Sequence, residues 1–339
     1  MKYPRSDHCA VSYQGNIYVF GGQSHDPNNL TNAHVLNNFT VYNMYLDTVE
    51  DLPSMPEPRY RFGYGVVNDK LYVFGGFAEI ENNFGTTPHP AGTMVYDFTT
   101  GKWDPYGANS PQMKNPRADL WGAAVNGMVY ALGGYNPPDF YNAVNTVEVL
   151  NPATGVWSYI ANMTYARGDL QANVANGSVY AFGGVTNVGI GNCSDYNSCH
   201  PWTNSVEVYN ANNNTWSLVA PMNWARGDFA TVVLKNGHII AVGGENGYDD
   251  AGTVRVNEVA QPWVEEYILE HNIWVPKAAL SEPRFRFAMA SDIGNFMYAF
   301  GGAPTCDDSF ANDTCSSQVL SSIIGFYDNE YPSIWAALT

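Results

Sequence analysis

Arginine recurs six times at the head of an apolar segment, and a charged residue follows each time two positions later. We call Arg5, Arg59, Arg117, Arg167, Arg226 and Arg284 the first arginines. The second-position residues are Asp7, Arg61, Asp119, Asp169, Asp228 and Arg286. Carboxylates that converge can bind a cation or the hydroxyls of a sugar, whereas arginine can bind a carboxylate or a sulfate. Either chemistry requires a fold that brings distant segments together.

Catalytic motifs are not visible around these residues. None of the seven histidines forms an H-E-x-x-H or a Cys/His zinc pattern, and the nucleophile motif G-x-S-x-G is absent. His8, beside Asp7, is the one acid/base candidate at this place. The sequence therefore predicts no catalytic residue and no cofactor. Ca²⁺ at the carboxylates remains an open alternative, and the metal set is unknown.

Composition narrows the partners and the fold class. The chain has 339 residues, with 15 Lys and Arg against 32 Asp and Glu, which gives a net charge of −17. A nucleic acid or an anionic membrane needs a basic surface, so both are disfavoured as partners. No apolar run reaches the ~20 residues of a membrane-spanning helix. The 14% of aromatic residues and the Asn-Gly pairs favour strands and tight turns.

Four of the five cysteines form two closely spaced pairs in polar segments. Cys193 and Cys199 lie in CSDYNSC, and Cys306 and Cys315 lie in CDDSFANDTC. We expect two short disulfide-closed loops, with zinc as the alternative, although neither pair has the C-x₂-C spacing of structural zinc sites. Cys9 is expected to be a buried free thiol in a strand.

Seven N-x-S/T sequons occur in the chain. They begin at Asn29, Asn38, Asn162, Asn176, Asn192, Asn213 and Asn312. Two of them adjoin the cysteine pairs, and together these features favour a secreted, glycosylated protein. The first residues lack the apolar core of a signal peptide, so a secreted form would have its leader outside this sequence.

Six internal repeats organise the chain. A double glycine closes each of the apolar runs IYVFGG, LYVFGG, VYALGG, VYAFGG, IIAVGG and MYAFGG. A strand and a turn precede each run, often with Asn-Gly, which is the strongest short signal for a β-hairpin. A variable polar loop, a third strand and a fourth strand follow, and tryptophan enters the fourth strand in five units. Val49 stands there in the first unit.

A strand that ends in Gly-Gly and is followed by Tyr and then Trp resembles the kelch repeat, six times over the whole chain. The resemblance implies an all-β fold, namely a six-bladed kelch β-propeller with four antiparallel strands per blade around a central channel. The expected single domain is 1–339, with blades at 1–55, 56–113, 114–163, 164–222, 223–280 and 281–339. The ring would close by packing blade 1 against blade 6, without an exchanged strand.

The resemblance also implies where the charges lie. The inner strands of kelch propellers start at one mouth of the channel, so all twelve charged residues are expected there, because i and i+2 in a strand point the same way. Sixfold repetition favours ion pairs between blades for the first arginines. The second-position residues break the symmetry and, with Trp121 and Trp224 nearby, form the expected ligand site. Acidic-peptide binding, known for kelch domains, matches only Arg61 and Arg286.

Three functions follow from these patterns. The preferred one is a secreted, non-enzymatic propeller that binds a glycan or an extracellular protein at the mouth formed by the charged residues and the long loops. The first alternative is an enzyme that acts on a sugar or sugar acid, such as a mutarotase, epimerase or lyase; this rests on fold analogy. The second is a structural module of an extracellular matrix or assembly, with Ca²⁺ between acidic loops.

Overall fold

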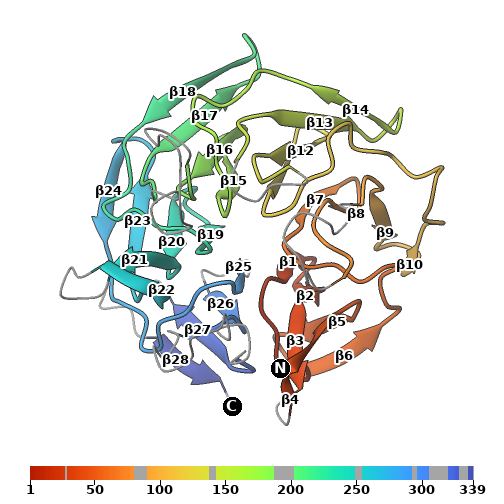
Figure 1. The fold of residues 1–339 in the computed structure, drawn as a ribbon, viewed down its shortest axis with the longest axis horizontal. Helices are drawn as coiled ribbons and strands as arrows, with labels where there is room; N and C mark the ends of the chain where they lie inside the picture. The colour runs from red at the N-terminus through yellow and green to blue at the C-terminus, as the bar shows by residue number, and fades with distance from the viewer. Residues whose placement is uncertain are drawn as a thin grey trace.

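Six four-stranded antiparallel sheets stand around a central axis, which confirms the predicted six-bladed propeller (Figure 1). The computed structural model describes residues 1–26, 29–79, 90–136, 143–186, 202–248, 254–291, 296–304, 320–327 and 335–338. Each sheet lies within one of the expected repeat units. Within the described part, no helix is long and apolar enough to span a bilayer.

The strands run outward from the axis in chain order within each blade. The first three blades are β1(Cys9–Tyr13), β2(Asn16–Phe20), β5(Phe39–Asn43), β6(Thr48–Leu52); β7(Gly63–Val67), β8(Lys70–Phe74), β9(Met94–Asp97), β10(Lys102–Trp103); β11(Trp121–Val125), β12(Met128–Leu132), β13(Val147–Asn151), β14(Val156–Tyr159). The last three are β15(Gln171–Ala175), β16(Ser178–Phe182), β17(Val206–Asn210), β18(Thr215–Val219); β19(Ala230–Val233), β20(Ile239–Val242), β23(Val264–Ile268), β24(Ile273–Pro276); β25(Ala288–Ser291), β26(Phe296–Phe300), β27(Ile323–Tyr327), β28(Trp335–Leu338).

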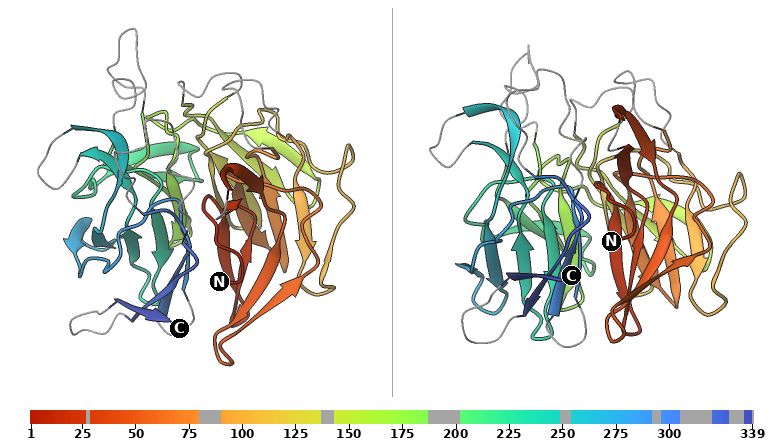
Figure 2. Two further views of the ribbon diagram at one scale, coloured as in Figure 1. Left: turned by 60° about the horizontal axis from the view of Figure 1, so that its bottom comes forward. Right: turned by 90° about the horizontal axis from the view of Figure 1, so that it is seen from below.

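Two additional hairpins extend blades 1 and 5, where the sequence predicted only loops. They are β3(Gln23–Asp26) with β4(Asn29–Val35) and β21(Glu245–Tyr248) with β22(Val254–Ala260). Both connect a second strand to a third strand. Figure 2 shows them on the same end of the propeller. We call this end, where the inner strands begin, the loop face.

Tight turns between the first and second strands lie on the opposite end, which we call the turn face. Asn126 and Gly127 both have positive φ, at 53° and 75°, and Asn176 and Gly177 repeat this with 48° and 72°. Two consecutive residues in the left-handed region define the primed turn whose twist matches a hairpin. The Asn-Gly signal therefore predicted these turns correctly.

The core is divided among the blade interfaces. Six buried apolar clusters each join residues of two neighbouring blades, and one of them joins blade 1 to blade 6 through Ala10, Ile17 and Val19 against Ala288 and Phe300. Burial of apolar surface between blades is therefore the main force that holds the ring together. The chain ends meet at this last interface, without an exchanged strand, as expected.

Candidate functional site

The second-position residues share an unusual backbone conformation at the loop-face end of the channel. Their φ angles lie between 48° and 54° in all six blades. Asp and Asn enter this left-handed region more readily than most residues, whereas arginine there is uncommon. The conformation recurs at every blade, so the fold imposes it on Arg61 and Arg286 as well.

A closed circle of backbone hydrogen bonds explains this conformation. The amide of each second-position residue donates to the carbonyl of its equivalent in the preceding blade, at 2.8 to 3.1 Å. The circle includes the bond from the Asp7 amide to the Arg286 carbonyl at 2.9 Å. The left-handed turn thus points the N–H along the circle, and six otherwise orphaned donors find partners.

A second circle runs outside the first. The amide of the second glycine in each blade donates to the carbonyl of the first arginine in the following blade, at 2.7 to 3.0 Å. The first glycine of each pair lies beside this contact, and Gly75 is an example: its φ is 67°, and a Cβ would lie 2.7 Å from the Arg117 carbonyl oxygen of the following blade. The double glycines therefore allow the backbone of one blade to approach the next.

The first arginines are not at the mouth of the channel. Their exposed fractions are 0 to 1%, because each guanidinium lies inside its blade. The prediction that the side chains at i and i+2 point the same way is wrong here. The second-position residue has a positive φ, which breaks the alternation of side chains at the start of the inner strand. Five of the six guanidinium groups donate to the carbonyl of the first glycine of their own blade, and Arg117 donates to Ala131.

Buried glutamates, which the sequence reasoning missed, neutralise three first arginines. Arg117 pairs with Glu148 at 2.7 Å, and both side chains are fully buried. The equivalent pairs, Arg167–Glu207 and Arg226–Glu265, measure 2.9 and 2.6 Å. These pairs lie within a blade, whereas pairs between blades were expected. The repeated Glu in VEVL, VEVY and VEEY was the signal that could have revealed them.

The other three blades lack this glutamate, and their first arginines have other partners. Arg59 and Arg284 pair with Glu57 and Glu282, which stand two residues before them. Tyr3 occupies that place in blade 1, and the Arg5 guanidinium lies 5.7 Å from its ring centroid. Burial lowers the pKa of Arg5 to about 10, and the Tyr3 hydroxyl and the Asp51 carboxylate oppose this shift. Blade 1 thus has the least compensated of these arginines.

The second-position side chains form an ion-paired chain around the axis. Arg61 reaches Asp7 at 3.2 Å and Asp119 at 3.4 Å, and Arg286 reaches Asp228 at 2.9 Å and Asp7 at 3.7 Å. The Arg–Asp pairs between blades are therefore formed by the second-position residues, and not by the first arginines for which they were expected. The structure brings all six predicted residues together, but it occupies the two arginines with carboxylates of their own ring. Whether they also bind a ligand stays a prediction.

Asp169 stands apart from this chain of ion pairs. Its carboxylate accepts a hydrogen bond from the Tyr135 hydroxyl at 2.9 Å. Burial raises its pKa well above the ordinary value, and the charge of Asp119 adds to the rise. Burial likewise raises the pKa of Asp119 to about 6 and that of Asp228 to about 7. Burial and mutual repulsion therefore favour the protonated forms of these three neighbouring carboxyls.

Asp7 has the opposite balance. Burial pushes its pKa up, but Arg61 and Arg286, together with hydrogen bonds from Ser6 and Gln23, outweigh burial and hold the pKa below its ordinary value. Asp7 is therefore the permanently ionised member of the set, between the two arginines. The basic and acidic sides predicted from the sequence thus differ in protonation as well as in residue type.

The ring encloses only a small space. The cavity lined by the second-position residues has a volume of about 40 Å³, enough for water but far below the ~300–1,000 Å³ of small-molecule sites. On the turn-face side, the inner strands line a channel of about 300 Å³. Trp121 and Gln171 line both spaces and so lie between them. Trp121 thus belongs to the axis, as predicted.

Trp224 lies elsewhere. Its ring stacks on that of Trp263 with centroids 5.4 Å apart and an interplanar angle of 14°. It does not line the cavity beneath the ring. The two indoles instead form a half-buried pair beside the buried pair of Arg226 and Glu265, to which Trp263 contributes its carbonyl.

His8 is buried beside the ring and lines its cavity. Neither ring nitrogen has a hydrogen-bond partner. Burial lowers its pKa well below the ordinary value, and the charge of Arg5 acts in the same direction. The imidazole is therefore neutral and packed, with no described group that would orient it for proton transfer.

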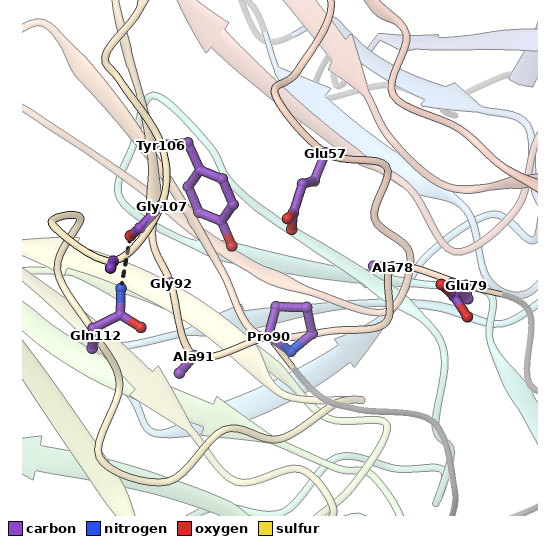
Figure 3. Close-up of a pocket in the computed structure, with 10 residues that line it drawn as sticks. Glu57, Ala78, Glu79, Pro90, Ala91, Gly92, Tyr106, Gly107 and Gln112 are labelled. Carbon is purple, nitrogen blue, oxygen red and sulfur yellow. Dashed lines mark hydrogen bonds between the residues drawn. The ribbon is translucent and has the colours of Figure 1, made fainter.

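A larger pocket opens on the loop face of blade 2, and no sequence motif indicated it. Its volume is about 340 Å³. Figure 3 shows the Tyr106 ring, the Glu57 carboxylate and Pro90 around the open space, with Glu79 and Gln112 at its sides. The Tyr106 hydroxyl accepts a hydrogen bond from the buried Arg59 at 2.7 Å, which fixes the ring.

The remaining predicted sites divide between described and undescribed residues. Cys193, Cys199, Cys306 and Cys315, with Asn192 and Asn312, lie outside the described residues. Asn162, Asn176 and Asn213 are exposed, as a glycan acceptor must be, and Asn38 is half-buried. Asn29 lies in β4, where only the backbone is described. Cys9 is free and buried, as predicted.

Metal-binding geometry is not assembled in the part of the chain that the structure describes. No group of three or more His, Cys, Asp or Glu side chains there could hold a metal ion. The two arginines separate Asp7 from the other three carboxylates of the ring and form ion pairs with three of the four. Ca²⁺ at these carboxylates stays a prediction.

Fold and repeats together define a kelch-type β-propeller. The family described as "KLHDC2/KLHL20/DRC7 Kelch-repeats domain" matches residues 1–184, and the Kelch motif matches residues 166–223. The first match covers more than half of the chain, and the chain therefore belongs to the kelch-repeat family.

Individual relatives are more distant. Kelch-like protein 40 of Mus musculus is 26% identical over 247 residues, which cover 70% of this chain and 37% of the relative. Alpha-scruin of Limulus polyphemus is 24% identical over 176 residues, covering 49% of this chain and 17% of the relative. The matches thus span well under half the length of these relatives.

A solved structure supports the fold over the full ring. The chain titled "Structure of YjhT" superposes with a TM-score of 0.73 at 14% identity, covering 98% of this chain and 97% of that one. At this identity the likeness concerns the fold alone.

Proposed function

We propose that this propeller is a non-enzymatic binding module that captures a protein partner on its loop face. The observation that carries the proposal is the difference in volume between the cavity within the ring and the pocket on the loop face of blade 2. The cavity within the ring holds about 40 Å³, whereas the loop face offers a pocket of about 340 Å³. A ligand larger than a few waters therefore has room on the loop face and none within the ring.

Structural variation is concentrated on the same face. The blades are alike in strand order, and among the described residues the hairpins β3–β4 and β21–β22 extend blades 1 and 5. Rigid scaffolds with variable connections at one end commonly bind through those connections. The matches to two longer kelch relatives cover 37% and 17% of their lengths, which is consistent with a propeller that serves as one module of a larger protein.

Charge indicates the chemistry of the partner. The chain carries a net charge of −17, and the pocket contributes two carboxylates and no basic side chain. Glu79 is exposed, and the side chain of Glu57 is 40% exposed although it pairs with Arg59 and hydrogen-bonds the Tyr106 hydroxyl. A lysine or arginine side chain of the partner would fit between these carboxylates and the Tyr106 ring.

The extracellular setting is part of this proposal. Its support is the exposure of the sequons at Asn162, Asn176 and Asn213, together with the two cysteine pairs in the sequence. A glycan attached to an extracellular partner remains an alternative ligand on the loop face. Treatment of the protein from its natural source with a peptide N-glycosidase, followed by mass spectrometry, tests the setting independently of binding.

Photo-crosslinking tests the proposal. A benzoylphenylalanine at Ala108, on the loop face, should crosslink a specific partner from extracts of the source organism. The same group at Gln14, in a turn on the opposite face, should not. Excess unmodified propeller should compete with the crosslink. A partner that crosslinks from Gln14 alone, or turnover of a sugar by the purified protein, would overturn the proposal.

The identified partner then allows a quantitative comparison. The double variant Glu57→Gln/Glu79→Gln should weaken binding about tenfold or more, because one hydrogen bond to a charged group contributes about 1.5–3 kcal/mol. Glu50→Gln/Asp51→Asn in β6, outside the loop face, is the matched control with an equal change in net charge. Equal losses in both double variants would indicate only a general charge effect.

A further inference from the structure

In the residues that the structure describes, the interface between blades 1 and 6 closes the ring without a disulfide or a shared strand. Its bonds include the Asp7 amide to the Arg286 carbonyl and the Gly302 amide to the Arg5 carbonyl, both at 2.9 Å. The N-terminal amine donates to the Ser321 carbonyl at 2.6 Å. We call this interface the seam. At each of the other five interfaces the chain runs directly from one blade into the next, so opening is least restrained at the seam.

One side chain at the seam differs in kind from its equivalents. Three residues after each first arginine, blades 2 to 6 have Phe62, Leu120, Leu170, Phe229 and Phe287. Each lies against the first glycine of the preceding blade and seals that interface with apolar surface. In blade 1 the residue is His8, whose Cε1 lies 3.0 Å from where a Cβ on Gly301 would stand.

The surroundings of His8 do not suit a charged imidazole. The residue is 3% exposed, and neither nitrogen has a partner. Arg5 and Asp7 act on it electrostatically, and the cavity that it lines also contains Arg61, Arg286 and the carboxyls of Asp119, Asp169 and Asp228. Asp7 is already engaged by two arginines. Protonation would therefore add a positive charge to a buried site in which Asp7 is already paired and the raised pKa values of Asp119, Asp169 and Asp228 favour their neutral forms.

The outer edge of the seam is also weaker than its equivalents. Trp216 and Trp274 donate their indole N–H to the Ala161 and Ala220 carbonyls of the preceding blade, both at 3.0 Å, and Trp103 donates to Pro53 at 2.8 Å. The equivalent residue of blade 1 is Val49, which has no donor and is 39% exposed. Blade 6 thus lacks the indole bond that blades 2 to 5 each donate to the blade before them.

We infer that the seam is an acid-sensitive joint, at which protonation of His8 separates the first blade from the last while the other five interfaces stay closed. The His8 pKa is lowered in the closed ring, so the open form takes up the proton first. The closed form therefore loses stability as the pH falls below about 6.5, the ordinary value for histidine. Above that pH, His8 contributes no pH dependence. The inference does not rest on the proposed function.

Hydrogen exchange at two equivalent amides tests this joint. The Gly302 amide bonds to Arg5 across the seam, and the Gly184 amide makes the same bond to Arg226 between blades 4 and 5. Between pH 6.5 and 5, the opening constant at Gly302 should rise by up to tenfold per pH unit, after correction for intrinsic exchange. The opening constant at Gly184 should not follow it. Parallel rises at both amides would overturn the inference.

Two variants separate titration of His8 from mere packing. His8→Phe restores the residue of blades 2, 5 and 6, and His8→Gln keeps a buried polar group that cannot titrate. Both should lose the acid response at Gly302, even though the glutamine variant is less stable at pH 7. The carboxyls of the ring titrate in all three proteins and so cancel in the comparison. An acid response that persists in either folded variant would show that another group opens the seam.

Discussion

The amide of Asp7 donates to the carbonyl of Arg286 at 2.9 Å, and this bond joins the first blade to the last. It is one of six equivalent bonds, so closure uses the same contact that joins every other pair of blades. The side chains of the two residues also form an ion pair at 3.7 Å. The residues that the sequence singled out for binding are therefore also residues that join each blade to the next.

Asp7→Asn tests the central role of this carboxylate. Asp7 is the one acidic residue that both arginines of the ring contact, and its side chain is almost fully buried. The variant should lose about 3–5 kcal/mol of unfolding free energy, the usual effect of breaking a buried ion pair. Urea unfolding measures the loss. Asp104→Asn removes an exposed carboxylate near Lys70 and should change the free energy by about 0–1 kcal/mol.

Asp228→Asn tests the protonation of the ring carboxyls. The Asp228 pKa is raised to about 7 in the folded state, above its ordinary value. The folded form thus holds a proton that the unfolded form has lost, and wild-type stability falls as the pH rises from about 4 to 7. The asparagine variant lacks this slope, so its stability relative to wild type should improve by up to about 1.4 kcal/mol per pH unit in that window. Urea midpoints between pH 5 and 8 measure the difference. A constant difference would mean that Asp228 is ionised throughout.

Glu207→Gln and Glu282→Gln form a matched pair for the first arginines. Glu207 is fully buried with Arg167, whereas the side chain of Glu282 is 45% exposed beside Arg284. The first variant should lose about 3–5 kcal/mol and the second about 0–1 kcal/mol. Thermal and urea unfolding compare them directly. Equal losses would show that burial of the partner does not decide the strength of these pairs.

Trp274→Phe tests the indole bonds between outer strands. The variant keeps an aromatic ring but removes the donor to the Ala220 carbonyl. A loss of about 0.5–1.5 kcal/mol is expected for one hydrogen bond. Val49→Phe places the same ring in blade 1, where no indole bond exists, and serves as a reference for the ring itself. A loss near zero at Trp274 would mean that solvent replaces the bond fully.

The sequence predicted the repeats correctly but not the local backbone geometry where each inner strand begins. Hydrophobic runs, double glycines and Asn-Gly turns are local signals, and they specified six blades correctly. The direction of the first arginines depends on the positive φ of residues such as Arg61, which no propensity rule assigns to arginine. The partners Glu148, Glu207 and Glu265 lie 31 to 40 residues from their arginines and become neighbours only after folding.

The proposed binding site could be predicted only in part, for the same reason. Second-position residues could be grouped from sequence because each blade repeats them. The pocket of Figure 3 draws Glu57, Pro90 and Tyr106 from separate connections of one blade, and no repeat marks them. Trp224 was grouped with the mouth because it adjoins Arg226, but its stacking on Trp263 follows from a contact between distant segments.

Hydrogen exchange with and without the crosslinked partner tests the central claim most directly. Binding should protect residues 77–79, 90–92 and 104–113 around the pocket, together with the hairpins at 23–35 and 245–260. The turns at 12–17, 124–129 and 174–179 on the opposite face should exchange as before. Protection confined to those turns, or to the residues that line the channel, would contradict the claim that the loop face binds the partner.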